Sequence, residues 1–300
     1  MTDNTQKIIA MSGRKQSGKN TSCNFIAGMV LLETQIVRDK FLVDEDGRLW
    51  VSDLFGDTEY EGWLDLNRQE PIFQDFAEKY IYPFVKIYSF ADLLKQEICM
   101  KILGLTVEQC YGTDEDKQTL THLRWEDMPG VVTKKPIDLA WSLTEGYTEQ
   151  KNEVFQISGR LGPYYEKLNG LLIYHEPGFM TARDGMQYVG TDVFRKMYGN
   201  VWVDGTLRRV KSEGAAIALI CDCRFANEVD GVLDIGGHVV RFTRDPFKDM
   251  HSSEVALDRN NYDWNKFSLV VDNAEMTINQ QNAAVYDYLY GVGMAPEIKK

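Results

Sequence analysis

The chain has 300 residues, 44% of them hydrophobic, and its 45 acidic against 33 basic side chains give a formal net charge of −12. This is enough apolar sequence for a large α/β domain with a real core. Because DNA- and RNA-binding proteins usually carry a basic surface, the acidic balance argues against a nucleic acid polymer as the main partner. A mononucleotide is compatible with it, since a few cations in one pocket suffice to hold such a ligand.

The cysteines and the apolar runs bear on the cellular compartment. The five cysteines are odd in number and follow no disulfide framework, and the Cys221-Asp222-Cys223 triplet lacks a second Cys/His pair at zinc spacing. We therefore expect reduced thiols and a cytoplasmic protein. The N-terminus has no signal-peptide layout and no apolar run approaches the length of a membrane span, so we expect no membrane partner.

The first part of the chain predicts a strand, a loop and a helix. Residues 7–11 are apolar and predict a buried strand, which a glycine-bearing loop joins to a helix over about 21–33. Residues 34–80 interrupt this rhythm with a hairpin, because an Asp-Gly pair at 46–47 lies between two apolar flanks. Further along the chain we expect a strand over 85–89, a helix over 92–103, and then loops with a mobile segment over 104–182.

The alternation of strands and helices resumes after residue 184. Five short apolar strands alternating with helices predict a three-layer α/β fold, with a mostly parallel sheet covered on both faces. We expect one domain over 1–300 with insertions at about 34–80 and 131–182, the second acting as a lid. The expected helices of this half cover 184–197, 204–213, 227–235 and 277–289, and the strands cover 215–221, 238–242 and 269–271.

The strongest motif lies between the first strand and the first helix and follows the pattern Gly-x4-Gly-Lys-x-Thr. Glycines let backbone amides fold around a phosphate, the helix N-terminus adds positive potential, and Lys19 adds a full charge for the β- and γ-phosphates. The alternative is a structural glycine turn at the sheet edge. The residues that we expect to bind ATP here are Gly13, Arg14, Lys15, Ser17, Gly18, Lys19, Asn20 and Thr21.

The motif departs from the usual one directly after the lysine, where Asn20 stands in place of Ser or Thr. The hydroxyl comes one position later, at Thr21. This Lys-x-Thr arrangement is similar to that of nucleoside monophosphate kinases, in which Mg²⁺ is held largely through water and the ATP itself. We therefore expect Thr21 to belong to a magnesium site that is mostly water-mediated.

Together the motifs resemble those of phage-encoded deoxynucleoside monophosphate kinases, and the matching pieces run in the same order over most of the chain. The resemblance implies a P-loop nucleoside-monophosphate-kinase fold, with the loop strand at the centre of a five-stranded parallel sheet. It also implies the reaction ATP + dNMP → ADP + dNDP with Mg²⁺, a location in the host cytoplasm, and homodimers as one form of assembly. The matching pieces are residues 13–21, 90–95, 187–192 with Trp202, 222–228, 236–237 with Arg244, 251–254 and 272–273.

Three residues outside the loop are expected on the donor side. Asp222 ends an apolar strand at the carboxyl edge of the sheet and matches the acidic residue that orients Mg²⁺ through water; the alternative is a cap on the next helix. Arg224 suits a phosphate clamp, with an ion pair to Glu228 as the alternative. Arg244 is expected at the ATP phosphates or, alternatively, in a salt bridge at the loop edge.

The acceptor residues follow from the resemblance alone. Lys95 and Arg183 are expected at the α-phosphate of the dNMP; the alternative for Lys95 is an ordinary exposed lysine of its helix. Ser252 carries no assignment beyond opening a capped turn with Glu254. The full set expected at the acceptor site is Leu94, Lys95, Arg124, Arg183, Gly190 and Thr191.

Three other functions stay open at this point. One is a P-loop kinase of another small acceptor, such as a ribonucleotide, shikimate or a dephospho-coenzyme A-like molecule. Another is a motor or packaging ATPase acting on DNA, although that class usually has an acidic pair where this chain has Asp222 followed by Cys223. The last is an ATP-binding protein without catalytic activity.

Overall fold

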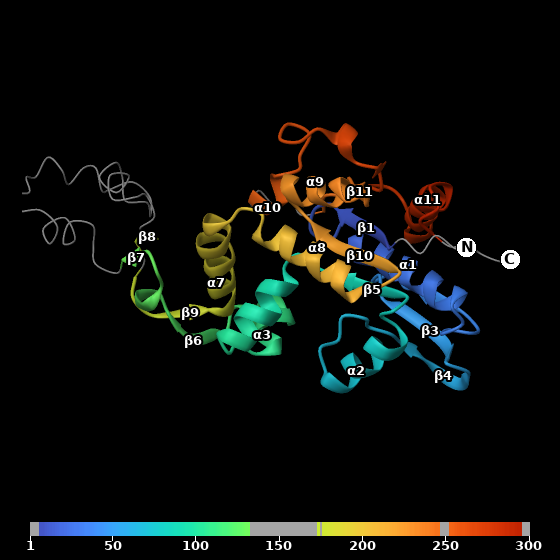
Figure 1. The fold of residues 1–300 in the computed structure, drawn as a ribbon, viewed down its shortest axis with the longest axis horizontal. Coiled ribbons are helices and arrows are strands. Elements are labelled where there is room, and N and C mark those ends of the chain that lie inside the picture. The colour runs from blue at the N-terminus through green and yellow to red at the C-terminus, as the bar shows by residue number, and fades with distance from the viewer. Residues whose placement is uncertain (1–5, 133–172, 175, 247–251, 296–300) are drawn as a thin grey trace, which may run out of the picture. The chain divides into compact units, whose positions relative to one another are not determined.

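The computed structural model describes residues 6–132, 173–174, 176–246 and 252–295 (Figure 1). The chain divides into two compact units. The sheet unit comprises residues up to Leu93 and from Asn200 onward, and the insert unit comprises Leu94–Gly199. Residues 34–80 lie in the sheet unit and the described part of 131–182 lies in the insert unit; that both are insertions into one domain stays a prediction.

A five-stranded parallel sheet forms the centre of the sheet unit (Figure 1). Its strand order is β12-β11-β1-β10-β5, and all four pairings are parallel, so the strand that precedes the glycine loop is central as predicted. Each strand was expected within two or three residues of its observed bounds. These are β1 (Lys7–Ser12), β5 (Val85–Tyr88), β10 (Ile217–Cys223), β11 (His238–Phe242) and β12 (Leu269–Val271).

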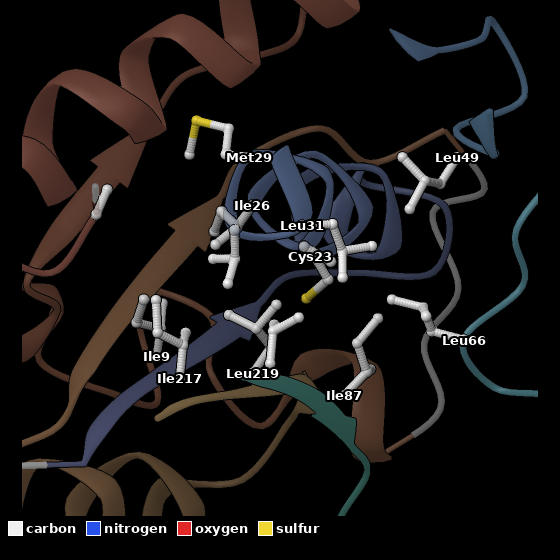
Figure 2. Packing of buried hydrophobic residues seen from close by; sticks show 14 of the residues in the cluster. Ile9, Cys23, Ile26, Met29, Leu31, Leu49, Leu66, Ile87, Ile217 and Leu219 are labelled. Atoms are coloured by element: carbon white, nitrogen blue, oxygen red, sulfur yellow. The ribbon is translucent and has the colours of Figure 1, made fainter. Parts of the chain in front are cut away.

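Alternating side chains of the strands build two cores, one on each face of the sheet. On one face, Ile9 packs with α1 (Lys19–Glu33) and α11 (Ile278–Gly291). Figure 2 shows Cys23 and Ile26 of α1 above the sheet on this side. The helices α8 (Val201–Glu213) and α9 (Ala226–Asp234) cover the other face, where Ile8, Ala10 and Ala218 belong to the core. The predicted three-layer fold is confirmed.

An antiparallel hairpin follows α1, as the Asp-Gly pair predicted. Strands β2 (Phe41–Val43) and β3 (Leu49–Leu54) are joined by a turn in which Gly47 has a φ of +80°, a conformation that glycine adopts without strain. A third strand, β4 (Asp57–Trp63), pairs with β3, and α2 (Pro71–Tyr80) comes next. Leu49 and Val51 are buried in the same core as α1.

The insert unit has its own small core, which includes Cys99, Leu123 and Met180. Our expectation of loops over 104–182 is wrong for residues 107–124, because two capping boxes start short helices there, at Thr106 and Thr113. The expected mobile segment and lid fall mainly on 133–172, outside the described residues. The elements are η1 (Leu93–Ile102, π-helical), α3 (Val107–Tyr111), α4 (Asp114–Lys117), β6 (Leu120–Arg124), η2 (Trp125–Asp127), β7 (Val131–Val132), β8 (Ile173–Tyr174), β9 (Phe179–Thr181), α7 (Ala182–Gln187) and η4 (Tyr188–Arg195, π-helical).

The cysteines are all free thiols, as expected. Burial raises the pKa of Cys99 to about 12 and also raises the pKa of Cys221 and Cys223, so these groups stay protonated at neutral pH. Among the described helices, none combines the length and the apolar character that a bilayer crossing requires.

Replacing the central core residue Leu219 by Ala tests this packing. Leu219 is fully buried in β10, so Leu219→Ala should lower the free energy of unfolding by about 2–5 kcal/mol. Ile72 of α2 is 87% exposed, and the control Ile72→Ala should change it by less than about 0.5 kcal/mol. Urea unfolding followed by circular dichroism gives both values, and equal losses would contradict the core described above.

Candidate phosphate-binding site

The glycine loop lies between the end of β1 and the start of α1, in the middle of the carboxyl edge of the sheet. Gly18 has a φ of +97°, and a Cβ at this position would come within 2.5 Å of the Gln281 side chain. Gln16 has a φ of +57° although it is not a glycine, which is uncommon and stores strain in the loop. The hydroxyl of Ser17 is buried and has no hydrogen-bond partner in the described part of the chain.

Lys19 closes the loop from inside. Its side chain is only 7% exposed, and its ammonium donates hydrogen bonds to the carbonyls of Gly13 (2.8 Å) and Arg14 (2.5 Å). Burial lowers the pKa of Lys19 to about 8, and the positive charge of Arg224 acts in the same direction, whereas Glu254 and Asp222 oppose the shift. The ammonium is therefore still protonated at neutral pH, and its burial leaves it poorly hydrated.

Carboxylates bind the Arg14 side chain and the backbone of Lys15. Arg14 pairs with Asp258 at 2.7 Å and with Asp245 at 3.5 Å. The backbone N–H of Lys15 donates to Oε2 of Glu254 at 2.7 Å. We call Glu254, Asp258 and Asp245 the loop carboxylates; Glu254 comes from the short helix α10 (Ser252–Val255). Sequence reasoning gave Glu254 only a capped turn with Ser252 and gave Asp245 and Asp258 no role, because nothing local in these segments points to the loop.

Arg224 also binds a loop carboxylate. Its guanidinium pairs with Oε1 of Glu254. The expected alternative, an ion pair with Glu228, is wrong, because Glu228 accepts the backbone N–H groups of Arg224 (2.7 Å) and Phe225 (3.1 Å) at the start of α9. Its carboxylate is thus occupied by the helix terminus, and the arginine side chain is directed toward the loop.

Buried amide side chains support the loop from behind. Asn273 donates to the carbonyl of Ser17 at 2.8 Å, and Gln281 donates to the carbonyl of Gly18 at 3.1 Å. Ser22, in the first turn of α1, donates to Asn282 at 2.9 Å. Gln281 and Asn282 lie on the buried side of α11, so two adjacent amides on an otherwise apolar helix face were the sequence signal that we missed.

Arg244 binds backbone carbonyls and forms no salt bridge with a described residue, so the expected alternative is wrong, while its contact with the ATP phosphates stays a prediction. Its Nε and Nη2 donate to the carbonyl of Asn273 at 3.1 and 2.9 Å, and Nη2 also donates to the carbonyl of Met276 at 2.7 Å. The guanidinium therefore fixes the chain that follows β12, next to the amide that holds Ser17. It supports the loop indirectly through the backbone.

Asp222 lies at the end of β10, beside the loop strand. Its Oδ1 accepts the N–H of Phe90 at 2.8 Å, and its Oδ2 accepts the hydroxyl of Ser89, so it binds the end of β5 and does not cap α9, whose cap residue is Phe225. Oδ2 also accepts the N–H of Ala91 at 3.4 Å, whereas Oδ1 keeps a lone pair for a further donor. Mg²⁺ in phosphate sites commonly uses one carboxylate together with water and the phosphates. Asp222 fits a water-held magnesium ion in this way.

Thr21 does not fit the magnesium site that we expected. Its hydroxyl lies against Gly47 in the turn between β2 and β3, where an added Cβ would come within 2.3 Å of it. The neighbouring Asn24 donates to the carbonyl of Gly47 at 2.8 Å, so this side of α1 faces the hairpin. Asn20 is exposed. In the described ranges, no three His, Cys, Asp or Glu side chains gather as a metal site made of protein ligands alone would require.

The cations expected at the acceptor site lie in the insert unit, and each has a partner there. The ammonium of Lys95 lies 4.5 Å from the ring centre of Tyr111. Arg183 pairs with Asp114 at 2.7 Å. Tyr111 ends α3 and Asp114 begins α4, and these helices pack together, so Lys95 and Arg183 lie around one helix pair. Arg124 binds Glu126 and lies over the ring of Phe179.

Gly190 and Leu94 are explained by packing. Gly190 is buried, and a Cβ there would come within 2.6 Å of Leu94, so the glycine lets η4 approach η1 closely. This accounts for both residues without a nucleotide. Thr191 is exposed on the same helix. The contact of Thr191 with the acceptor stays a prediction, as do those of Lys95 and Arg183.

No protein-family model matches this sequence, and no functionally characterised protein matches it either. The function must therefore be argued from the site itself.

The pKa of Lys19 leads to a prediction about pH. A bound triphosphate stabilises the ammonium, so binding above the pKa of the free loop requires uptake of a proton. The dissociation constant of ATP should be nearly flat below about pH 7.5 and rise roughly fivefold between about pH 8 and pH 9, as measured by isothermal titration calorimetry. In Lys19→Arg, whose guanidinium stays charged, this rise should disappear whatever the affinity. A wild-type affinity that is constant up to about pH 9.5 would contradict the buried, pKa-shifted lysine.

Proposed function

We propose that this protein is an ATP-dependent kinase of nucleoside monophosphates, with deoxynucleotides as its acceptors. One observation carries the proposal. A Gly-x4-Gly-Lys loop connects the central strand to α1, its lysine is buried at the loop, and Asp222 and Arg224 lie at the end of the neighbouring strand β10. Phosphoryl transfer needs mainly alignment and charge neutralisation, and this arrangement offers both.

The donor side would work as follows. Loop amides and Lys19 hold the β- and γ-phosphates, and the guanidinium of Arg224 binds two phosphate oxygens at once. The unpaired hydroxyl of Ser17 gains an acceptor when a phosphate oxygen enters the loop. Mg²⁺, when bound, supplies further charge neutralisation, and Asp222 would hold it through water. An oxygen of the acceptor phosphate attacks the γ-phosphorus, the bond to the β–γ bridging oxygen breaks, and ADP leaves.

The acceptor side depends on cations of the insert unit. The Arg183–Asp114 pair is open to solvent, with side chains 36% and 61% exposed. Exposed ion pairs contribute only about 0–1 kcal/mol, so a substrate phosphate can take over Arg183 at little cost. Lys95, on η1, lies against Tyr111 of the neighbouring helix α3 and adds a second charge. Because the chain carries a net charge of −12, an anionic acceptor needs such cations at its binding site.

The direct test is ADP formation from ATP with each deoxynucleoside and ribonucleoside monophosphate, in the absence of DNA. We expect ADP to form only when a monophosphate is present, fastest with one or more dNMPs. Lys19→Ala should lower kcat at least tenfold, a loss of about 1.4 kcal/mol or more in transition-state stabilisation. ADP formation that requires DNA, or none with any acceptor, would contradict the kinase; activity with another small acceptor alone would contradict the substrate.

Arg183 provides a separate test of the acceptor side. Arg183→Lys keeps the charge but loses the bidentate fork, so it should reduce kcat/KM for dNMP by about 1–2 kcal/mol, and Arg183→Ala should reduce it more. The KM of ATP should change far less. Arg208 of α8 lies in the sheet unit, and Arg208→Ala serves as the matched loss of one arginine. A rise in the KM of ATP with an unchanged KM of dNMP would assign Arg183 to the donor instead.

A further inference from the structure

The carboxylate of Glu254 is the most deeply placed of the loop carboxylates. Glu254 is 7% exposed, and its two oxygens are used by two different parts of the site. Oε2 accepts the backbone N–H of Lys15 at 2.7 Å, and Oε1 pairs with the guanidinium of Arg224. The same carboxylate lies close enough to Lys19 to favour its charged form. One buried carboxylate thus binds the Lys15 N–H and the Arg224 guanidinium and lies near the Lys19 ammonium.

These partners are the ones that the loop would offer to a phosphate. A backbone N–H of a phosphate loop, an adjacent guanidinium and the loop lysine are donors for an anionic oxygen, and a carboxylate presents the same kind of acceptor as a phosphate. A donor that is engaged by Glu254 is not available to a nucleotide. If both anions occupied the site together, like charges would lie side by side in poorly hydrated surroundings, which is unfavourable.

We infer that Glu254 is an internal competitor of the donor phosphates: its carboxylate occupies an anion position at the loop, and ATP must displace it from Lys15 and Arg224 to bind fully. The inference rests on the proposed function, since it requires a loop that binds a triphosphate. The exchange replaces one anion by another, so neither Arg224 nor the loop is left with an uncompensated charge in either state. Glu254 therefore lowers the affinity for triphosphate and is not needed to hold the bound nucleotide.

The surroundings allow such an exchange without unfolding the segment. Glu254 belongs to a helix of four residues, whereas the chain after it is anchored independently. Leu257 is buried, its carbonyl accepts the indole N–H of Trp264 at 2.8 Å, and the hydroxyl of Tyr262 binds Asp230 at 2.8 Å. Only the Glu254 side chain has to leave the loop.

Binding measurements with ATP and with inorganic triphosphate test the inference. Glu254→Gln keeps the size of the side chain and removes its charge, so it should lower the dissociation constants of both ligands at least tenfold. Glu254→Asp keeps the charge but is too short to reach both partners, and it should give at least a threefold decrease. The control Glu213→Gln removes a carboxylate that pairs with Lys86 and Arg209 and has no contact with the loop residues, and it should leave both constants unchanged.

The outcomes separate this inference from the proposed function. Unchanged or weaker binding by Glu254→Gln, in a protein whose binding is abolished by Lys19→Ala, would overturn the inference alone. A fall in kcat without tighter binding would also overturn it, because Glu254 would then position Arg224. If wild type and Glu254→Gln both fail to bind ATP and triphosphate, the loop is not a phosphate site and both proposals fail. Should Glu254→Gln not fold, the threefold criterion for Glu254→Asp decides.

Discussion

Burying the Lys19 ammonium at the end of the central strand is the constraint around which the rest of the site is arranged. A charged amine loses hydration when it is buried, and the lowered pKa of Lys19 records that cost. Two loop carbonyls accept hydrogen bonds from the ammonium, and the carboxylates of Asp222 and Glu254 supply negative charge nearby. Each of these groups must in turn be held in position. Asp222 is fixed by the residues that follow β5, and the loop carbonyls are fixed by the fold of the loop itself.

The loop is held from two sides by chemically different groups. On the α11 side, neutral amides bind the carbonyls of Ser17 and Gly18. On the α10 side, carboxylates bind the Arg14 guanidinium and the Lys15 N–H. Neutral amides keep their partners whether or not an anion is present, while carboxylates compete with any anion that arrives. The first set therefore preorganises the backbone of the loop, and the second set determines how strongly the loop can bind an anion.

Sequence reasoning succeeded where the determining interactions are local. The sheet strands are continuous apolar runs, the hairpin has its Asp-Gly turn, and the loop motif lies within nine consecutive residues. The contacts of the site residues could not be predicted from the sequence. Lys15 and Glu254, for example, are 239 residues apart in the chain, and nothing in either segment specifies the other. Two short helices of the insert unit were missed although their capping boxes were readable, because a polar composition was taken to mean loops. The direction of the Thr21 hydroxyl depends on the hairpin that packs on α1, which no local pattern reveals.

The contact between Gly18 and Gln281 has a consequence for synthesis of the protein. Ser17 is synthesised 256 residues before Asn273, whose amide binds its carbonyl, and Gln281, which binds the carbonyl of Gly18, comes later still. Both strands that flank β1 in the sheet are also made late, since β10 and β11 lie beyond residue 216. A nascent chain thus carries the whole glycine motif long before it has a pocket. A ligand that needs the completed loop cannot assist early folding steps in such a chain, and any stabilisation by it begins only after α11 has docked.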